Sequence, residues 1–465
     1  PAADFLSFWM LDCLVPIDVA FFAADGTVTA VHAMRAEPPR AKDEAVAAYR
    51  ARLPRYGSPT RAVGALELGA GEMARLGVKA GSKLTLPAGF GMLDGLAPRI
   101  VSALRMPTLN AFMALGRVDW SAARAHVSAM LSSGAGSIER HPRRDAVLLD
   151  RAVLAMRLPA EIGDYTDFYA SEHHATNVGS MFRPNQPLMP NWKHLPVGYH
   201  GRSSTIVVDG TPVRRPHGQT VASDDGPPSF GPSKLMDHEL EMGVFLGGAA
   251  NALGERIAVG RADERLFGCV IVNDWSARDV QKWEYQPLGP FNAKNFCTSI
   301  SPWVVTLEAL RPYCRPGPAR GAADPPVLDY LRRADDYVVD VRLEVTIASA
   351  GMRAAGTAPT RISLGSFADM YWTMSQMLAH HASTGCVMRP GDLLASGTIS
   401  GPTKESRGCM LERTWRGTEP VTLGDGTERR FLQDGDEVTI TGWCEAAGHP
   451  RIGFGQCRGV VMPAA

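Results

Sequence analysis

Four carboxylates between residues 167 and 274 have the type and the setting for a metal site. Glu239 and Glu241 are two positions apart in an apolar run, so in a strand both would point to the same face. Asp274 follows a second apolar run, and Asp167 lies in the segment DYTDFY at residues 164–169. Carboxylates side by side repel each other and need a cation. With no His or Cys among them, the set predicts a hard ion, Mg²⁺ or Ca²⁺.

The same acidic pattern also has an ordinary structural interpretation. Charged residues at every second position of a strand most often form a solvated face without a bound ion. The pattern alone therefore leaves both interpretations open, and the neighbouring residue types have to decide between them.

Two histidine pairs stand out because imidazole is the natural general base near neutral pH. In the pair His173-His174, the second residue follows Asp167 by seven positions. The pair His380-His381 falls in a stretch with helical spacing, where packing or a favourable charge at a helix end is the more ordinary role. Most histidines are structural or exposed, so neither pair identifies a catalytic base without further context.

Further polar residues could stabilise a developing negative charge. Arg278, Gln281 and Tyr285 are spaced for one face of a helical turn that follows Asp274. Lys294 stands in an apolar context between two phenylalanines. An Arg, a Gln and a Lys beside a carboxylate-bound metal could form an oxyanion hole, but a salt-bridged loop explains the same residues equally well.

Other catalytic classes leave no signature in the sequence. The glycine-containing residues 198–204 and 395–401 indicate tight turns close to a ligand, but neither fits a P-loop or a dinucleotide fingerprint. No Gly-x-Ser-x-Gly elbow occurs, which disfavours a serine hydrolase.

Short strands must position most of the candidate residues. From residue 161 onward, apolar runs are short and turn residues recur at close intervals. Residues 337–347 alternate apolar with polar side chains, which predicts one half-buried strand, and residues 437–443 predict another. One long helix is predicted over residues 367–381. The predicted fold class is therefore mainly β (α+β), a sandwich or roll with a few helices.

Three parts of the chain differ in pattern. Residues 1–88 predict a small β-rich N-terminal domain, with a hairpin signal at residues 25–26. Residues 89–160 predict a helical connecting segment, including an Ala-rich helix over 120–131 that a glycine-containing run ends. Residues 161–465 contain all the candidate site residues and form the predicted catalytic domain.

Bulk composition narrows the range of partners. The 465 residues include 48 Lys and Arg against 48 Asp and Glu, which gives no electrostatic footprint for nucleic acid or an anionic membrane. No apolar run approaches the ~20 residues that span a bilayer. The eight cysteines are scattered without a CxxC pair, which favours reduced thiols in a cytoplasmic protein. The expected partner is a small molecule or another subunit.

Taken in order, the motifs resemble the fumarylacetoacetase family. The resemblance is nearly continuous from residue 107 to the C-terminus, and motifs this long and this ordered are specific. The stretches that carry it are residues 164–169, 174–179, 195–202, 239–242, 273–279, 288–291, 395–401 and 453–457. The resemblance implies a fumarylacetoacetase-type β-sandwich roll, preceded here by the small N-terminal domain, and usually a homodimer.

The resemblance also implies the metal centre and its reaction. The family cleaves the carbon–carbon bond of 4-fumarylacetoacetate, a β-diketone diacid, into fumarate and acetoacetate, the last step of tyrosine and phenylalanine catabolism. The implied ligands of the catalytic Ca²⁺ or Mg²⁺ are the four carboxylates Asp167, Glu239, Glu241 and Asp274. A second cation would lie at Lys294 and Thr298, through backbone oxygens.

Catalytic and substrate-binding roles follow from the same resemblance. His174 would be the general base that activates water, and Glu412 would orient its imidazole. The implied oxyanion hole is formed by Arg278, Gln281 and Lys294. The residues that would hold the substrate are Tyr169, Arg183, Tyr199, Gln281, Tyr285 and Thr398.

Two alternatives remain beside this interpretation. A hydrolase of another acylpyruvate or β-diketone acid in the same superfamily would keep the metal ligands. It need not keep Arg183 and Tyr169, which would bind a carboxylate of the substrate. A catalytically inactive binding module would be insensitive to the loss of His174. The intact set from Asp167 to Glu412 argues against the second alternative.

Residues 1–88 depart from the family pattern. They resemble part of a small bacterial β-rich domain family of unknown function, and the usual motifs of the fumarylacetoacetase N-terminal domain are not found. Either a gene fusion or strong divergence would explain this difference. All catalytic motifs follow residue 160, so the expected activity does not depend on it.

Overall fold

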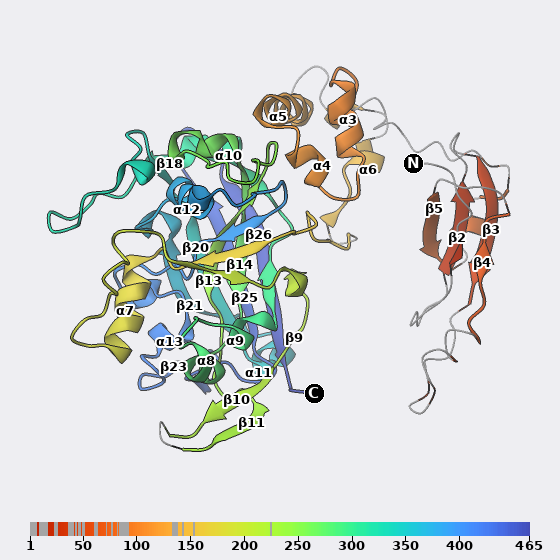
Figure 1. Ribbon diagram of the computed structural model, residues 1–465. Helices are drawn as coiled ribbons and strands as arrows, with labels where there is room; N and C mark the ends of the chain where they lie inside the picture. Colours follow the sequence, from red (N-terminus) through yellow and green to blue (C-terminus); the bar gives the residue numbers. More distant parts are fainter. Residues whose placement is uncertain are drawn as a thin grey trace. The chain divides into compact units, whose positions relative to one another are not determined.

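The computed structural model shows the chain as two units, Pro1–Gly95 and Leu96–Ala465 (Figure 1). All the candidate site residues belong to the second unit. The structure describes residues 7–8, 17–22, 27–35, 41, 44, 48, 52–59, 64–70, 72–75, 78–80, 82, 93–132, 138–141, 144–151, 154–223 and 226–465.

The first unit is built on a three-stranded antiparallel sheet in the order β3-β2-β5. The predicted hairpin is present as β2 (Ile17–Phe22) and β3 (Val28–Met34), although its turn at residues 25–26 lies outside the described residues. Ala20 and Val28 are buried with Met73 in a small cluster. The remaining elements are β1 (Ser7–Phe8), β4 (Tyr56–Gly57), β5 (Gly64–Gly69) and α2 (Glu72–Arg75).

Helices begin the second unit and cover one part of its main sheet. The predicted helix over 120–131 is present as α5 (Arg117–Leu131), and the glycines expected to end it lie outside the described residues. Trp120 packs edge-on against Phe267 of the sheet, with ring centroids 5.0 Å apart. The other helices of this segment are α3 (Pro98–Leu104), α4 (Asn110–Met113), η2 (Ile138–Arg140) and α6 (Arg144–Val147).

The main sheet has eight strands in the order β7-β6-β22-β13-β14-β16-β8, with β17 paired to β14. Its two central strands are buried along their whole length, as expected for strands covered on both faces. The strands are β6 (Tyr165–Phe168), β7 (Gly198–Gly201), β8 (Ile206–Val208), β13 (Leu240–Leu246), β14 (Leu266–Asp274), β16 (Thr298–Ile300), β17 (Val305–Thr306) and β22 (Leu393–Ala395).

A five-stranded sheet in the order β21-β20-β25-β26-β9 packs against the main sheet. Ile271 of β14 shares one hydrophobic core with Leu343 and Ile440 of this second sheet. The strands are β9 (Val213–Arg214), β20 (Arg342–Ala348), β21 (Thr360–Ser366), β25 (Glu437–Cys444) and β26 (Ile452–Met462). The predicted mainly β fold class, with two packed sheets and a few helices, is confirmed.

The prediction of one continuous strand over residues 337–347 is wrong. The segment forms two strands, β19 (Tyr337–Val339) and β20, which belong to different sheets. The strand is interrupted at Asp340, whose carboxylate accepts a hydrogen bond from Ser366 and pairs with Arg315. The predicted alternation holds within β20, where Leu343, Val345 and Ile347 are buried.

The long helix predicted over 367–381 is also shorter than expected. A 3₁₀ turn, η8 (Phe367–Asp369), comes first, and the helix α12 covers only Met374–His381. Thr373 begins it through a capping box with Gln376, a Thr-x-x-Gln signal that fixes a helix start.

Other elements complete the unit around these two sheets. Small strand pairs are β10 (His217–Val221) with β11 (Pro228–Pro232), β12 (Met236–Asp237) with β15 (Ser276–Ala277), β18 (Cys314–Pro316) with β19, and β23 (Val421–Thr422) with β24 (Glu428–Arg429). The remaining helices are α7 (Glu172–Phe182), α8 (Arg278–Glu284), α9 (Asn292–Asn295), α10 (Leu307–Leu310), α11 (Ala350–Ala355) and α13 (Met410–Arg413). Among the described residues, no helix is long and apolar enough to cross a bilayer.

Candidate active site

Neighbouring strands of the main sheet bring the four predicted carboxylates together. Asp167 is the third residue of β6, Glu241 lies in β13 with Glu239 just before it, and Asp274 is the last residue of β14. Strand pairing carries these positions to one end of the sheet, because Leu240 pairs with Asn273. The four residues are buried, and each offers one carboxylate oxygen within 4.8 Å of the others.

The unsatisfied atoms of this cluster fit a hard divalent cation. Oδ1 of Asp167 and both carboxylate oxygens of Glu241 are buried without a hydrogen-bond partner. A buried carboxylate without a partner is costly, and oxygen ligands grouped in this way are what Mg²⁺ and Ca²⁺ bind. The set could therefore hold a metal ion, as its residue types predicted. The solvated-face interpretation of the acidic pair does not hold, since Glu241 is fully buried.

Lys294, Tyr199 and Thr298 surround the cluster and satisfy part of its charge. The ammonium of Lys294 pairs with Glu239 and lies 2.8 Å from Oδ2 of Asp274. The hydroxyl of Tyr199 donates to Asp167 at 2.7 Å and to Asp274 at 3.0 Å. Thr298 donates to Oδ1 of Asp274 at 2.7 Å. The side chains of Lys294 and Thr298 thus belong to this cluster, and a second cation at their backbone oxygens stays a prediction.

Ionisation within the cluster is uneven. Burial and the charge of Asp274 raise the pKa of Asp167 well above its usual range. Burial and the charge of Asp167 likewise raise the pKa of Glu241. Burial opposes the ionisation of Glu239 too, but the charges of Lys294 and Arg278 outweigh it and lower that pKa. One lysine and one shared arginine leave the cluster short of positive charge, which favours an added cation.

His174 and Glu412 form a buried pair beside the cluster. Nδ1 of His174 lies 2.6 Å from Oε2 of Glu412, and the two side chains are 4% and 0% exposed. Burial opposes the ionisation of Glu412, but the charge of His174 and hydrogen bonds from His174, Asn177 and Ser400 lower its pKa to about 2. An ionised carboxylate only accepts hydrogen bonds, so Nδ1 carries the proton and Nε2 is left as a base.

Local helix chemistry fixes both members of this pair. Ser171 caps α7 by accepting from the backbone N–H of His174, which places that histidine in the first turn. Asn177 follows three residues later on the same face and donates to Oε1 of Glu412 at 2.9 Å. Ser400 and Cys409 also donate to Oε2 of Glu412, at 2.8 and 3.2 Å.

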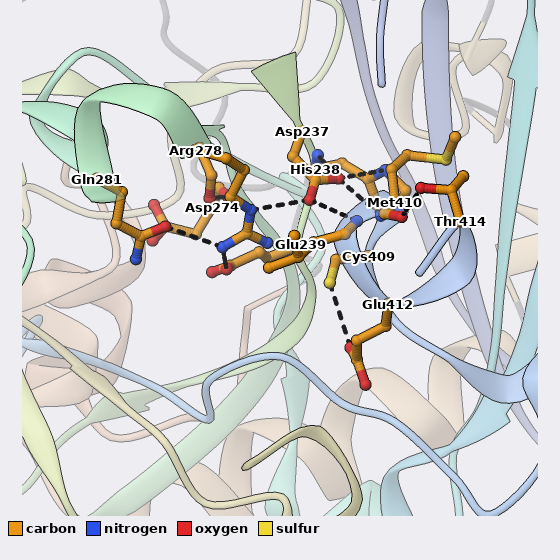
Figure 2. A network of polar contacts seen from close by, with 12 residues as sticks. Asp237, His238, Glu239, Asp274, Arg278, Gln281, Cys409, Met410, Glu412 and Thr414 are labelled. Atoms are coloured by element: carbon orange, nitrogen blue, oxygen red, sulfur yellow. Dashed lines mark hydrogen bonds and ion pairs between the residues drawn. The ribbon is translucent and has the colours of Figure 1, made fainter. Parts of the chain in front are cut away.

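Arg278 lies at the start of α8 and is held from two sides. Its Nε donates to Asp237 at 2.8 Å, and its Nη1 donates to Glu239 at 2.6 Å and to Gln281 at 3.1 Å. Figure 2 shows the guanidinium between these side chains. The Nη2 atom is buried with no hydrogen-bond partner in the structure, so it remains available to an oxygen of a ligand.

The predicted substrate-binding residues are brought together only in part. The ring of Tyr169 packs edge-on against His174, with ring centroids 5.1 Å apart. Burial and the charge of Glu412 raise the pKa of Tyr169, and the charge of Arg183 opposes this rise. Nε of Arg183 and the hydroxyl of Thr398 are buried without a partner. Tyr285, by contrast, is 38% exposed at the end of α8, and its hydroxyl accepts from the neighbouring Gln286.

Comparison with known proteins decides the family. Residues 164–462 match the family model described as fumarylacetoacetate (FAA) hydrolase C-terminal. The fumarylacetoacetase of Homo sapiens is 53% identical over 360 residues, which cover 77% of this chain and 84% of the human protein. The chain belongs to the fumarylacetoacetase family. The fumarylacetoacetases of Bos taurus and Dictyostelium discoideum are 54% and 48% identical, over 77% and 84% of this chain and 84% and 92% of the respective relatives.

The N-terminal part of this fumarylacetoacetase-family chain combines two matches. Residues 71–159 match the family model described as fumarylacetoacetase N-terminal, although the usual motifs of that domain were not found in the sequence analysis. Residues 1–86 match a family described as uncharacterized ACR, which agrees with the resemblance to a domain of unknown function.

Two functional contacts in this fumarylacetoacetase-family site were not predicted as such. Asn177 lies in the stretch 174–179 that carries the resemblance and had no predicted role of its own, although its spacing from His174 places both on one helix face. Asp237 stands two positions before Glu239, the same spacing that drew attention to Glu241. Its contacts run to segments distant in sequence, so local spacing alone gave no role for it.

Proposed function

We propose that this chain hydrolyses the carbon–carbon bond of 4-fumarylacetoacetate to fumarate and acetoacetate, as the name of its relatives implies. The observation that carries the proposal is the buried His174–Glu412 pair standing beside four carboxylates with unsatisfied oxygens. A general base can activate water and a divalent cation can polarise a carbonyl, so the two together suit the hydrolysis of a β-diketone.

The bound ion would supply the positive charge that polarises the diketone, and Asp167, Glu239, Glu241 and Asp274 would hold it. We infer Ca²⁺ or Mg²⁺ from the all-oxygen set. His174 would take a proton from water at Nε2, and Glu412 would keep the resulting imidazolium in place. The water oxygen would attack the fumaryl carbonyl carbon. Collapse of the resulting oxyanion would break the bond between this carbon and the neighbouring CH₂ carbon, so that the attacked carbon becomes a carboxyl group of fumarate. His174 would return the proton to the CH₂ carbon, which leaves as the methyl group of acetoacetate.

Arg278 would act on the oxyanion that forms at the attacked carbonyl. Its Nη2 is the one nitrogen of the guanidinium without a partner in the structure, while the other two are fixed by Asp237 and Glu239. Donors fixed before the reaction stabilise a developing charge without reorganising. Gln281 and Lys294 would complete the oxyanion hole, and Arg183 would pair with a substrate carboxylate.

An isotope experiment tests the proposed reaction. Turnover in H₂¹⁸O should give fumarate with one ¹⁸O atom and unlabelled acetoacetate, identified by mass spectrometry. Acetate or malonate among the products would contradict attack at the fumaryl carbonyl, because attack at the other ketone would release one of these in place of acetoacetate. A parallel panel of acylpyruvates should show kcat/KM at least tenfold lower than for 4-fumarylacetoacetate, and the reverse order would favour the acylpyruvate alternative.

We also propose a homodimer, which the resemblance implied, and a cytoplasmic location. Phe230 and Trp283 are 77% and 40% exposed, and both adjoin Gln219, by strand pairing and by a hydrogen bond. Leu288 and Phe291 add exposed apolar surface shortly after α8. Light scattering should give a dimer for the wild type and a smaller mass for Phe230→Ser.

The described cysteines are free, in keeping with a reducing compartment.

A further inference from the structure

Asp237 connects two parts of the site that are distant in sequence. It ends β12 and is fully buried. Its Oδ2 accepts from Nε of Arg278 at 2.8 Å and from the backbone N–H of Leu411 at 3.0 Å. Its Oδ1 accepts from the backbone N–H of Met410 at 2.7 Å and from that of His238 at 2.9 Å. One carboxylate therefore holds a cationic side chain and the start of a helix (Figure 2).

The helix that Asp237 holds is the one that carries Glu412. The first N–H groups of that helix, α13 (Met410–Arg413), precede the first intrahelical hydrogen bond, from Arg413 to Cys409, so they need other partners. Cys409 at its N-cap makes no side-chain capping bond. The carboxylate of Asp237 satisfies the N–H groups of Met410 and Leu411 instead, and Glu412 is the next residue. The direction of the Glu412 side chain toward His174 thus depends on this contact.

The guanidinium that Asp237 holds is oriented by the same carboxylate. Nε of Arg278 bonds to Asp237 and Nη1 bonds to Glu239, which leaves Nη2 as the free donor. A planar fork fixed at two nitrogens has no freedom to turn its third. Without Asp237, Arg278 would keep only the contacts on its Nη1 side, and Nη2 would no longer have one position.

We propose that Asp237 is a positioning residue that sets the geometry of both the base pair His174–Glu412 and the oxyanion donor Arg278. The hydrogen bonds described for its carboxylate go to Arg278 and to backbone N–H groups, and it acts through Glu412 and Arg278. This inference rests on the proposed hydrolysis. A displacement of about 1 Å in catalytic groups can lower a rate about 10²-fold.

Asp237→Asn is the direct test, because an amide of the same shape presents an N–H₂ group to donors. We expect kcat for 4-fumarylacetoacetate to fall about 10²-fold or more while KM changes less than threefold. Asp436→Asn is the matched control. Asp436 is also buried, and it pairs with Arg429 and accepts from the backbone N–H of Gln433, away from the site residues. The Asp436→Asn variant should keep a kcat per folded molecule within threefold of that of the wild type.

Double-variant cycles separate positioning from general loss of stability. If Asp237 acts through Arg278 and Glu412, its substitution should cost at least tenfold less in kcat when Arg278→Ala or Glu412→Ala is already present. Costs that are additive in both cycles would overturn the proposal. So would a kcat for Asp237→Asn within threefold of the wild type.

A second variant and a wild-type measurement complete the test of Asp237. If Asp237→Asn does not fold, Asp237→Glu, which keeps the charge but shifts the carboxylate by one methylene, takes its place with the same expected split between kcat and KM. Wild-type turnover is measured first. No wild-type turnover would count against the proposed hydrolysis, whereas active wild type with an equally active Asp237 variant would count against the positioning role alone.

Discussion

His174 donates a hydrogen bond from Nδ1 to Oε2 of Glu412 across 2.6 Å, although 238 positions separate the two residues in the chain. The acceptor carries hydrogen bonds from Asn177 and Ser400 as well, so it is fixed on more than one side. A fixed, ionised acceptor selects one tautomer of the imidazole and leaves Nε2 free to accept a proton.

His174→Ala should remove the general base. We expect kcat to fall about 10²–10⁴-fold, the usual contribution of a positioned base, with unchanged secondary structure by circular dichroism. His173→Ala is the matched control, since the neighbouring imidazole is only half-buried and does not bond to Glu412. Equal rates for the two variants would remove His174 from this role.

Glu241→Gln should weaken metal binding without destabilising the metal-free protein. Both oxygens of Glu241 are buried without a partner, and burial raises its pKa, so a neutral side chain relieves repulsion. In EDTA we expect a melting temperature equal to or above that of the wild type. Added Ca²⁺ or Mg²⁺ should raise the wild-type value and leave the variant unchanged. Glu344→Gln, in β20, serves as the control.

Arg278→Lys should lower kcat about 10²–10³-fold, the cost of losing one oxyanion donor. A lysine offers a single ammonium, which does not reproduce the fork that binds Asp237 and Glu239 together. Steady-state kinetics with equal divalent-ion saturation measures the change. A variant with wild-type kcat would show that the guanidinium has no part in the chemical step.

Asp263, which is none of the proposed site residues, should make the free energy of unfolding depend on pH in the acid range. Burial opposes its ionisation, but hydrogen bonds from Arg333, Arg311 and Tyr337 lower its pKa from 3.8 to about 2. A lowered folded-state pKa stabilises the fold above about pH 3.8, and this contribution disappears as the pH falls toward 2. Urea unfolding should show a loss of at most about 2.5 kcal/mol over that window, absent in Asp263→Asn. An identical pH profile in the variant would contradict this assignment.

Thr373→Ala should destabilise the protein by about 0.5–2 kcal/mol because it removes the capping box that starts α12. The turnover of folded protein should stay within twofold of the wild type, since Thr373 contacts Asp336 and Gln376 and no proposed site residue. Urea unfolding followed by circular dichroism measures the loss, and unchanged stability would place the start of α12 elsewhere.

Local pattern predicted the strands that carry the metal ligands better than it predicted their surroundings. The period-two spacing of Glu239 and Glu241 and the apolar run before Asp274 correspond to β13 and β14. The break at Asp340 was not predictable, because it follows from contacts with Ser366 and Arg315 that alternation of apolar residues does not encode.

Long-range contacts set the remaining limit for the site. Asp237 precedes Met410 by 173 positions, and only the folded sheet brings α13 to it. The proposed pairing of His174 with Glu412 came from the resemblance and not from spacing, for the same reason. Local rules identify residue types and the elements that carry them, whereas the partner of each side chain is decided by tertiary packing.

The most direct measurement is the rate at which purified protein consumes 4-fumarylacetoacetate, followed by loss of the diketone absorbance, after EDTA treatment and after Ca²⁺ or Mg²⁺ is restored. The account predicts turnover that EDTA abolishes and that the divalent ion restores, with fumarate and acetoacetate formed in equal amounts. No turnover by folded protein with the ion bound, or a full rate in EDTA, would contradict it.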